Sequence, residues 1–165
     1  MVEVIITGEM LLEARDKAAE MGQLRNSIIR GAGNIAGFLG EAIAQKVMGG
    51  TLANTYEYDL VMEDGTTVDV KTKQTSVKPL ETYECSIAAL NDTQECDFYA
   101  FVRVKNDFTV GWYLGVYNKH QYIKDSVYMK KGDKDHSNGY VVKSDCHNLA
   151  ISQLKEDINA AKETT

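Results

Sequence analysis

Residues 56–73, YEYDLVMEDGTTVDVKTK, decide the fold of this 165-residue chain. Two runs rich in β-branched and aromatic residues, 56–62 and 66–73, flank the turn-forming triplet Glu63-Asp64-Gly65. This pattern is typical of a β-hairpin. We therefore predict two antiparallel strands joined by a tight turn.

The length of that turn decides whether two acids of the hairpin meet. Side chains alternate along a strand, so Asp69 and Lys71 share one face and are neighbours. A two-residue turn would leave Asp59 and Asp69 on opposite faces. A three-residue loop, with Gly65 in the left-handed position of a bulge, sets Asp59 directly opposite Asp69. Both loops suit the sequence, and we adopt the second.

In this register the two carboxylates lie about 5 Å apart at the backbone, and their repulsion is destabilising unless a cation sits between them. Carboxylates without a nearby histidine or cysteine suit hard ions, so the expected cofactor is Mg²⁺ or Mn²⁺. A water molecule there can attack phosphorus while Lys71 orients or deprotonates it. The predicted chemistry is phosphodiester hydrolysis.

A helix is predicted just before the hairpin, over residues 33–48, with apolar residues at helical spacing and Gly49-Gly50 as its end. Its polar face carries Glu41 on a strip bordered by glycines. Three glycines in one helix indicate that another chain approaches its backbone closely, either a packed strand or a nucleic-acid strand. Glu41 is either a surface acid or a further metal ligand, acting directly, through water or on a second ion.

The rest of the chain continues with predicted strands and helices. The predicted helices are a first helix from Thr7 to Gly22 and later ones at 86–93, 119–124 and 148–162. The predicted strands are 97–104, 108–116 and 140–142, with a polar loop at 130–135. This order predicts an α/β (α+β) fold in which helices pack on a mixed sheet, and the length suits one domain over residues 1–165.

Composition limits the possible functions. The formal charge of −6 argues against strong non-specific nucleic-acid binding, although catalytic carboxylates contribute part of it. No segment approaches the ~20 apolar residues of a membrane span, and no basic, apolar leader opens the chain, so we expect a cytoplasmic protein. Cys85, Cys96 and Cys146 are odd in number and widely spaced, which is typical of reduced thiols.

Together these residues resemble the PD-(D/E)XK nuclease superfamily. In that family an acid on one strand and an acid-x-lysine on the next bind the metal, with a glutamate on the preceding helix. The corresponding pieces here are Gly40-Glu41, Tyr58-Asp59 and Asp69-Val70-Lys71, and Tyr58 stands where the family has proline. Residues 97–104, the Gly111-Trp112 strand and the Lys130-Lys131-Gly132 loop look like the second half of small phage and restriction-type members.

The resemblance implies a restriction-endonuclease-like fold with a central mixed β-sheet flanked by helices. It implies Asp59, Asp69 and the carbonyl of Val70 as metal ligands, Glu41 as an auxiliary ligand and Lys71 as the catalytic lysine. We therefore predict a metal-dependent deoxyribonuclease with DNA as its partner, as a monomer or a homodimer, in the cytoplasm of a cell or of a phage host.

Further residues are candidates for contacts with the nucleic acid. Lys73 and Gln74 follow the triplet and can reach a phosphate or the attacking water, although such residues also occur as plain edge residues. Arg30 can clamp a phosphate, and Lys130 and Lys131 can grip the backbone, although acids interleave that loop.

The alternative function is a non-catalytic module on the same fold that binds nucleic acid or protein, which the acidic charge favours. An inhibitor that mimics DNA is a third possibility, against which the intact acid-x-lysine triplet argues.

Overall fold

Two β-sheets form the centre of the molecule in the computed structural model, which describes residues 1–21, 32–53, 55–135 and 139–163. The larger sheet has the order β1 (Val2–Ile5), β7 (Val110–Asn118), β6 (Phe98–Lys105), β4 (Thr67–Thr75), β3 (Leu60–Val61) and β2 (Thr51–Leu52). It is a mixed sheet, because β4 and β6 are parallel whereas the other neighbours are antiparallel. The smaller sheet is antiparallel, with the order β5 (Glu84–Ala88), β9 (Cys146–Ala150) and β8 (Val127–Met129).

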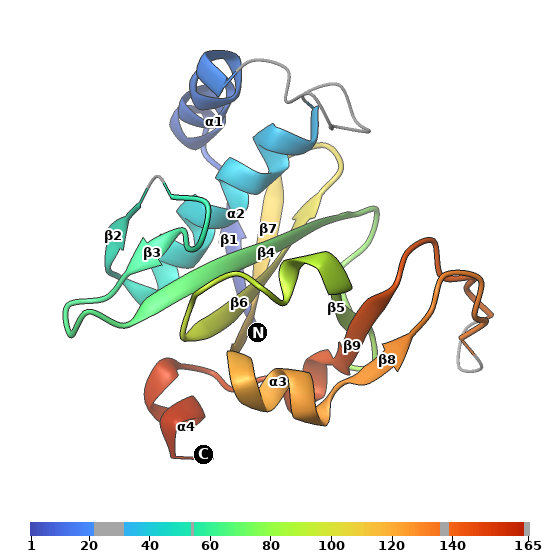
Figure 1. The fold of residues 1–165 in the computed structure, drawn as a ribbon. Helices are drawn as coiled ribbons and strands as arrows, with labels where there is room; N and C mark the ends of the chain where they lie inside the picture. The colour runs from blue at the N-terminus through green and yellow to red at the C-terminus, as the bar shows by residue number, and fades with distance from the viewer. Residues whose placement is uncertain (22–31, 54, 136–138, 164–165) are drawn as a thin grey trace.

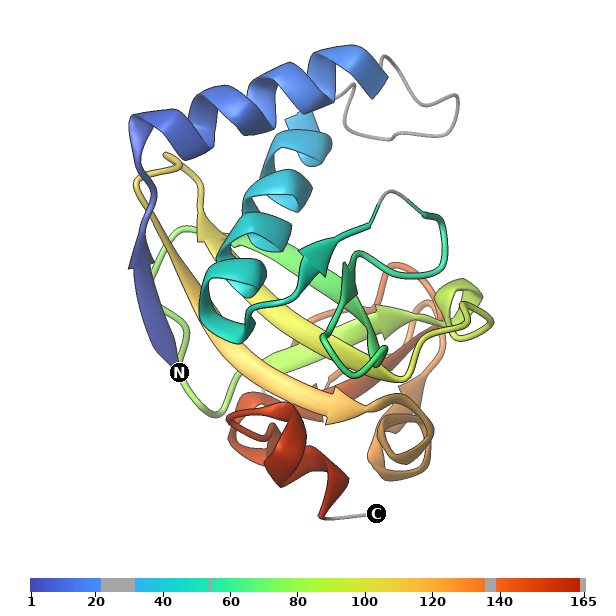
Figure 2. The same cartoon turned by 90° about the vertical axis from the view of Figure 1, so that its left-hand side faces the viewer.

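Helices and the smaller sheet cover the two faces of the larger sheet, which curls (Figure 1, Figure 2). On one face lie α1 (Gly8–Met21) and α2 (Ala32–Met48). On the other lie the smaller sheet and α3 (Lys119–Asp125). Near the end of the chain, α4 (Ile158–Lys162) packs against β7. The molecule is therefore a mixed α+β protein, as the sequence predicts at this coarse level.

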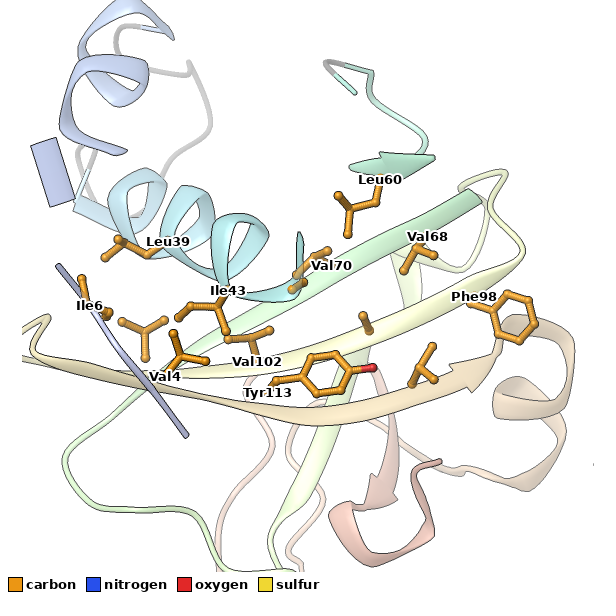
Figure 3. Close-up of a cluster of buried hydrophobic side chains, with 14 of the residues drawn as sticks. Val4, Ile6, Leu39, Ile43, Leu60, Val68, Val70, Phe98, Val102 and Tyr113 are labelled. Atoms are coloured by element: carbon orange, nitrogen blue, oxygen red, sulfur yellow. The ribbon is translucent and has the colours of Figure 1, made fainter. Parts of the chain in front are cut away.

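The larger hydrophobic core lies between α2 and the sheet. Leu39 and Ile43 are fully buried on the inner face of α2. Ile43 lies toward Val102 of the sheet, and Leu39 lies beside Ile6 in the same cluster (Figure 3). These residues recur at helical spacing, so apolar burial on one face explains why this segment is helical. Gly49 and Gly50 follow at φ 80° and 81°, and end the helix.

On α2, the backbone at Gly40 lies very close to a neighbouring strand. A Cβ at Gly40 would overlap the side chain of Thr72 on β4, whereas one at Gly37 would meet open space. The sequence left open whether a packed strand or a nucleic-acid strand approaches this helix, and at Gly40 the structure has a packed strand.

Alternation along β4 separates its core residues from its polar ones. Val70 belongs to the core beneath α2. Asp69 and Lys71 lie level with Tyr99 and Phe101 of β6, which belong to the hydrophobic cluster on the other face. The acid and the lysine of the triplet therefore share the sheet face that carries β5, β8 and β9.

The structure confirms the three-residue turn of the hairpin. The N–H of Met62 donates to the carbonyl of Thr66, and the N–H of Gly65 donates to the carbonyl of Met62, both at 2.9 Å. Gly65 has φ 83°, the left-handed conformation that such a bulge requires. Leu60 pairs with Val68. The N–H of Asp59 donates to the carbonyl of Val68 at 2.9 Å, so the strand pairing ends there with Asp59 beside Val68 and Asp69. The first strand is shorter than predicted, because only Leu60–Val61 pairs as β3.

The helix predicted over residues 86–93 is wrong. Glu84–Ala88 forms β5, and only Ala89–Asn91 is helical, as a single 3₁₀ turn. Cys85 and Ile87 alternate inward to a buried cluster and pair with β9. Pairing with a strand some 60 residues away in sequence outweighed the local helical preference.

The long helix predicted over residues 148–162 and the strand over 140–142 are also wrong. The first segment is the end of β9, a 3₁₀ turn at Ile151–Gln153, and the short helix α4, whose N-cap Asp157 accepts from the N–H of Ala160 at 2.9 Å. In the second, Val141 makes an isolated bridge to Lys134. The last strand is β9, which the sequence pattern did not indicate.

Two expectations from composition can be compared with the structure. Cys85, Cys96 and Cys146 are free thiols, as predicted. Among the described residues, every helix is too short or too polar to cross a lipid bilayer.

Candidate active site

Asp59 and Asp69 lie close together at the start of β3. Oδ2 of Asp59 accepts a hydrogen bond from the backbone N–H of Val70 at 2.7 Å, and so takes the place of a further strand residue beside β4. Asp69 lies at the neighbouring position of β4, and its negative charge acts on the carboxyl group of Asp59. Two ionised carboxylates side by side repel each other, and a bound cation would offset that repulsion.

The environment of Asp59 favours its protonated form. Burial raises the pKa of Asp59 well above its ordinary value, and the negative charges of Glu41 and Asp69 raise it further. The hydrogen bond from Val70 acts in the opposite direction, because it stabilises the ionised carboxylate. Asp69 itself is only 5% exposed.

Glu41 of α2 belongs to the same group of acids. Burial raises the pKa of Glu41 to about 7, nearby Lys17 partly offsets this, and Asp69 raises it further. Glu41 is therefore not a solvated surface acid. It is a partly buried carboxyl group within electrostatic reach of Asp59 and Asp69, as the sequence prediction of an auxiliary ligand requires.

Lys71 stands next to the pair of aspartates. Its Nζ lies 2.5 Å from Oδ2 of Asp69 and donates a hydrogen bond of 2.7 Å to Oε1 of Gln94. The same Nζ lies 5.8 Å from the ring centroid of Tyr99, a distance compatible with a cation–π contact. The ammonium group is thus fixed in position by three neighbours.

Gln94 is a site residue that sequence reasoning missed. Its amide bridges Lys71 to the first half of the hairpin, because Nε2 donates to the carbonyl of Tyr56 at 2.8 Å. Nζ of Lys119, at the start of α3, donates to the backbone carbonyl of Gln94. Gln94 lies 23 positions after Lys71, in a loop without a recognisable motif, so no local signal marks it.

The donor set is compatible with a divalent cation of the Mg²⁺ type. Asp59, Asp69 and Glu41 offer hard oxygen donors. Burial raises the pKa of Asp59 and of Glu41, and neighbouring acids raise both further, an effect that a bound cation would offset. In the described part of the chain, no three His, Cys, Asp or Glu side chains stand close enough to form a finished metal cage. A cation would therefore draw Glu41 closer or leave it in an outer position, and Lys71 would have to release Asp69.

The residues predicted to contact nucleic acid lie in different parts of the molecule. Lys73 and Gln74 line a cleft that continues along β4 beyond Lys71. Lys130 and Lys131 lie in an exposed turn after β8, where their backbone N–H groups donate to Asp133 and Asp145. That turn is not part of the cleft wall. Arg30 lies outside the described residues.

Comparison with known proteins gives no family assignment. No protein-family model matches this sequence, and no curated protein matches it. The arguments for function therefore rest on the residues and their geometry.

Proposed function

We propose that this chain is a metal-dependent nuclease of the PD-(D/E)XK type, with a restriction-endonuclease-like fold, that hydrolyses phosphodiester bonds in DNA. The observation that carries the proposal is the arrangement around the hairpin. Oδ2 of Asp59 accepts from the N–H of Val70, next to Asp69. Lys71 is held beside Asp69, and Glu41 of α2 lies within electrostatic reach of both aspartates. Acids on two adjacent strands and a lysine two positions after the second acid are the parts that this reaction needs.

Asp59, Asp69 and the carbonyl of Val70 would hold Mg²⁺ or Mn²⁺, with Glu41 as an auxiliary ligand. When bound, the ion supplies Lewis-acid stabilisation of the charge that develops on the phosphate and the leaving oxygen. Ligands to such an ion are deprotonated, so the raised pKa of Asp59 means that ion binding would compete with a proton on Asp59.

Lys71 has a separate task. An ammonium group has three N–H donors, and Asp69 and Gln94 engage two of them. The remaining donor can hold a non-bridging phosphate oxygen or orient the attacking water. Gln94 keeps Nζ at this position when Asp69 turns to the metal, so Gln94 is a positioning residue.

The test is cleavage of supercoiled, linear, single-stranded and branched DNA in the presence of Mg²⁺ or Mn²⁺. We expect Lys71→Ala and Asp69→Asn to lose roughly 100-fold or more in rate while remaining folded. Lys124→Ala, which removes an exposed lysine of α3, is the matched control and should cut like wild type. Wild-type rates from both site variants would contradict the proposal.

A second candidate is a non-catalytic binding module on the same fold. The contact of 2.5 Å between Lys71 and Asp69 favours it, because this ion pair already balances one acid without a metal. The net charge of −6 is a second argument for it. Titration calorimetry with Mn²⁺ separates the two, because a binding module has no need of tight metal binding, whereas a nuclease should bind Mn²⁺ and lose that binding in Asp69→Asn.

A further inference from the structure

A cleft of about 750 Å³ opens between β4 and β6 of the larger sheet and the smaller sheet. We call it the Arg103 cleft, after the side chain in its wall. Three cationic side chains line it: Arg103 from β6, Lys73 from β4, and Lys143 from the segment before β9. Lys73 and Arg103 are level with each other on neighbouring strands. The cleft therefore concentrates positive charge in a protein that is acidic overall.

Arg103 is unusual because it is a buried cation without a counter-charge. The residue is only 7% exposed, and its Nη2 donates to the carbonyl of Glu84 at 2.7 Å. No ion pair within the described residues includes Arg103. A buried charge balanced only by a neutral carbonyl is costly, and burial lowers its pKa. An anion in the cleft would offset this cost, and a guanidinium group suits the oxygens of a phosphate in particular.

Two acids line the same cleft and reduce its positive charge only in part. These acids are Glu84 and Asp135, and burial together with Asp135 raises the pKa of Glu84. With both acids ionised, two negative charges face three cations. The net charge of the cleft lining is therefore positive and favours an anionic ligand.

The position of the cleft identifies the ligand. Lys73 follows Lys71 by two residues on the same face of β4, a rise of about 6.6 Å, which is of the order of one nucleotide of backbone. A strand whose phosphodiester lies at Asp69 and Lys71 would thus reach the cleft with its neighbouring phosphate. The cleft volume lies in the range of small-ligand pockets, roughly 300–1,000 Å³, and both sheets contribute to its lining, which suits one nucleic-acid strand better than a duplex.

We propose that the Arg103 cleft binds a phosphate of a single DNA strand, one nucleotide from the bond that is cut, with Arg103 as the anchor and Lys73 and Lys143 as its partners. The substrate class is therefore DNA that is unpaired beside the cleavage point, as in a single strand, a flap or a gap. The placement of the cut bond rests on the proposed nuclease function, whereas the phosphate site does not.

The experiment measures binding without cleavage. A fluorescent oligothymidylate is titrated in EDTA by anisotropy, as a single strand and as a duplex with oligodeoxyadenylate, at several salt concentrations. We expect the single strand to bind about tenfold more tightly than the duplex. Arg103→Gln should weaken single-strand binding about tenfold, and it should reduce the slope of log affinity against log salt by about 0.7, the value for one lost phosphate contact. Arg15→Gln, on the exposed face of α1, is the matched control and should bind like wild type.

Unchanged affinity and salt slope in folded Arg103→Gln would overturn the proposal, as would equal binding of strand and duplex. If Arg103→Gln does not fold, the exposed pair Lys73→Gln and Lys143→Gln decides by the same two readouts. The two proposals fail separately. Strand binding that depends on Arg103, in a protein that cuts no substrate, refutes only the nuclease. Cutting with binding that is indifferent to Arg103 refutes only the cleft.

Discussion

Replacing Glu41 by glutamine should make the protein more stable at alkaline pH. Burial raises the pKa of Glu41 to about 7 from the ordinary 4.5 of a glutamate, so folding favours the protonated form. Ionising this carboxyl group in the folded chain therefore costs about 3 kcal/mol as an upper limit. Glu41 is half-buried, so solvent screening lowers the expected value to about 1–3 kcal/mol. Glu41→Gln removes this cost because an amide stays neutral.

The sign of the effect fixes its pH window. Below pH 4.5 the carboxyl group is neutral in both folded and unfolded chains, and the variant should match wild type. Between pH 4.5 and about 7 the cost to wild type grows, and above pH 7 it is complete. Urea denaturation at pH 4 and pH 8, in EDTA, measures the difference, and in thermal melts it corresponds to a gain of roughly 2–4 °C per kcal/mol.

Glu13→Gln is the control for this prediction, since Glu13 is exposed on α1 and should give no pH-dependent gain. A gain for Glu41→Gln that is equal at pH 4 and pH 8 would refute the electrostatic explanation. A loss of stability at pH 8 would show that ionised Glu41 is stabilising, through Lys17 or another partner.

Three further predictions concern packing, positioning and metal. Gly40→Ala should lower the free energy of unfolding by about 1–3 kcal/mol in urea, because the new Cβ overlaps Thr72. Gly37→Ala places its Cβ in open space and should raise the free energy of unfolding by roughly 0.5–1 kcal/mol. Equal effects of the two variants would contradict this packing. Gln94→Ala frees Lys71 and should lower the cleavage rate about tenfold with little change in melting temperature, so an unchanged rate would refute its positioning role. Mg²⁺ at about 100 times its Kd should stabilise the wild type by about 2.7 kcal/mol at pH 8. The gain should be smaller at pH 5, where protons compete for the ligands, and EDTA should abolish it. Equal gains at both pH values would refute proton-linked binding.

Local sequence predicted the centre of the candidate site because its parts are close together along the chain. Gly65 adopts the positive φ of the bulge, and the three-residue turn pairs Leu60 with Val68, which leaves Asp59 and Asp69 close together at the edge of the hairpin. Period-2 alternation placed Lys71 beside Asp69, and helical spacing placed Glu41 on the polar face of α2. The sequence left two turn lengths open, and the structure resolved that choice.

Only the tertiary structure brought Gln94 to Lys71 and turned Arg103 into the wall of a cleft. The cleft depends on β5 pairing with β9, which lies about 60 residues later and forms the opposite side of that cleft. Local propensity favoured helices in both segments, and the prediction failed there. Burial of Ile87 and Leu149 against the sheet stabilises the strands instead. Such pairing depends on which distant apolar face is available, and a window of neighbouring residues does not contain that information.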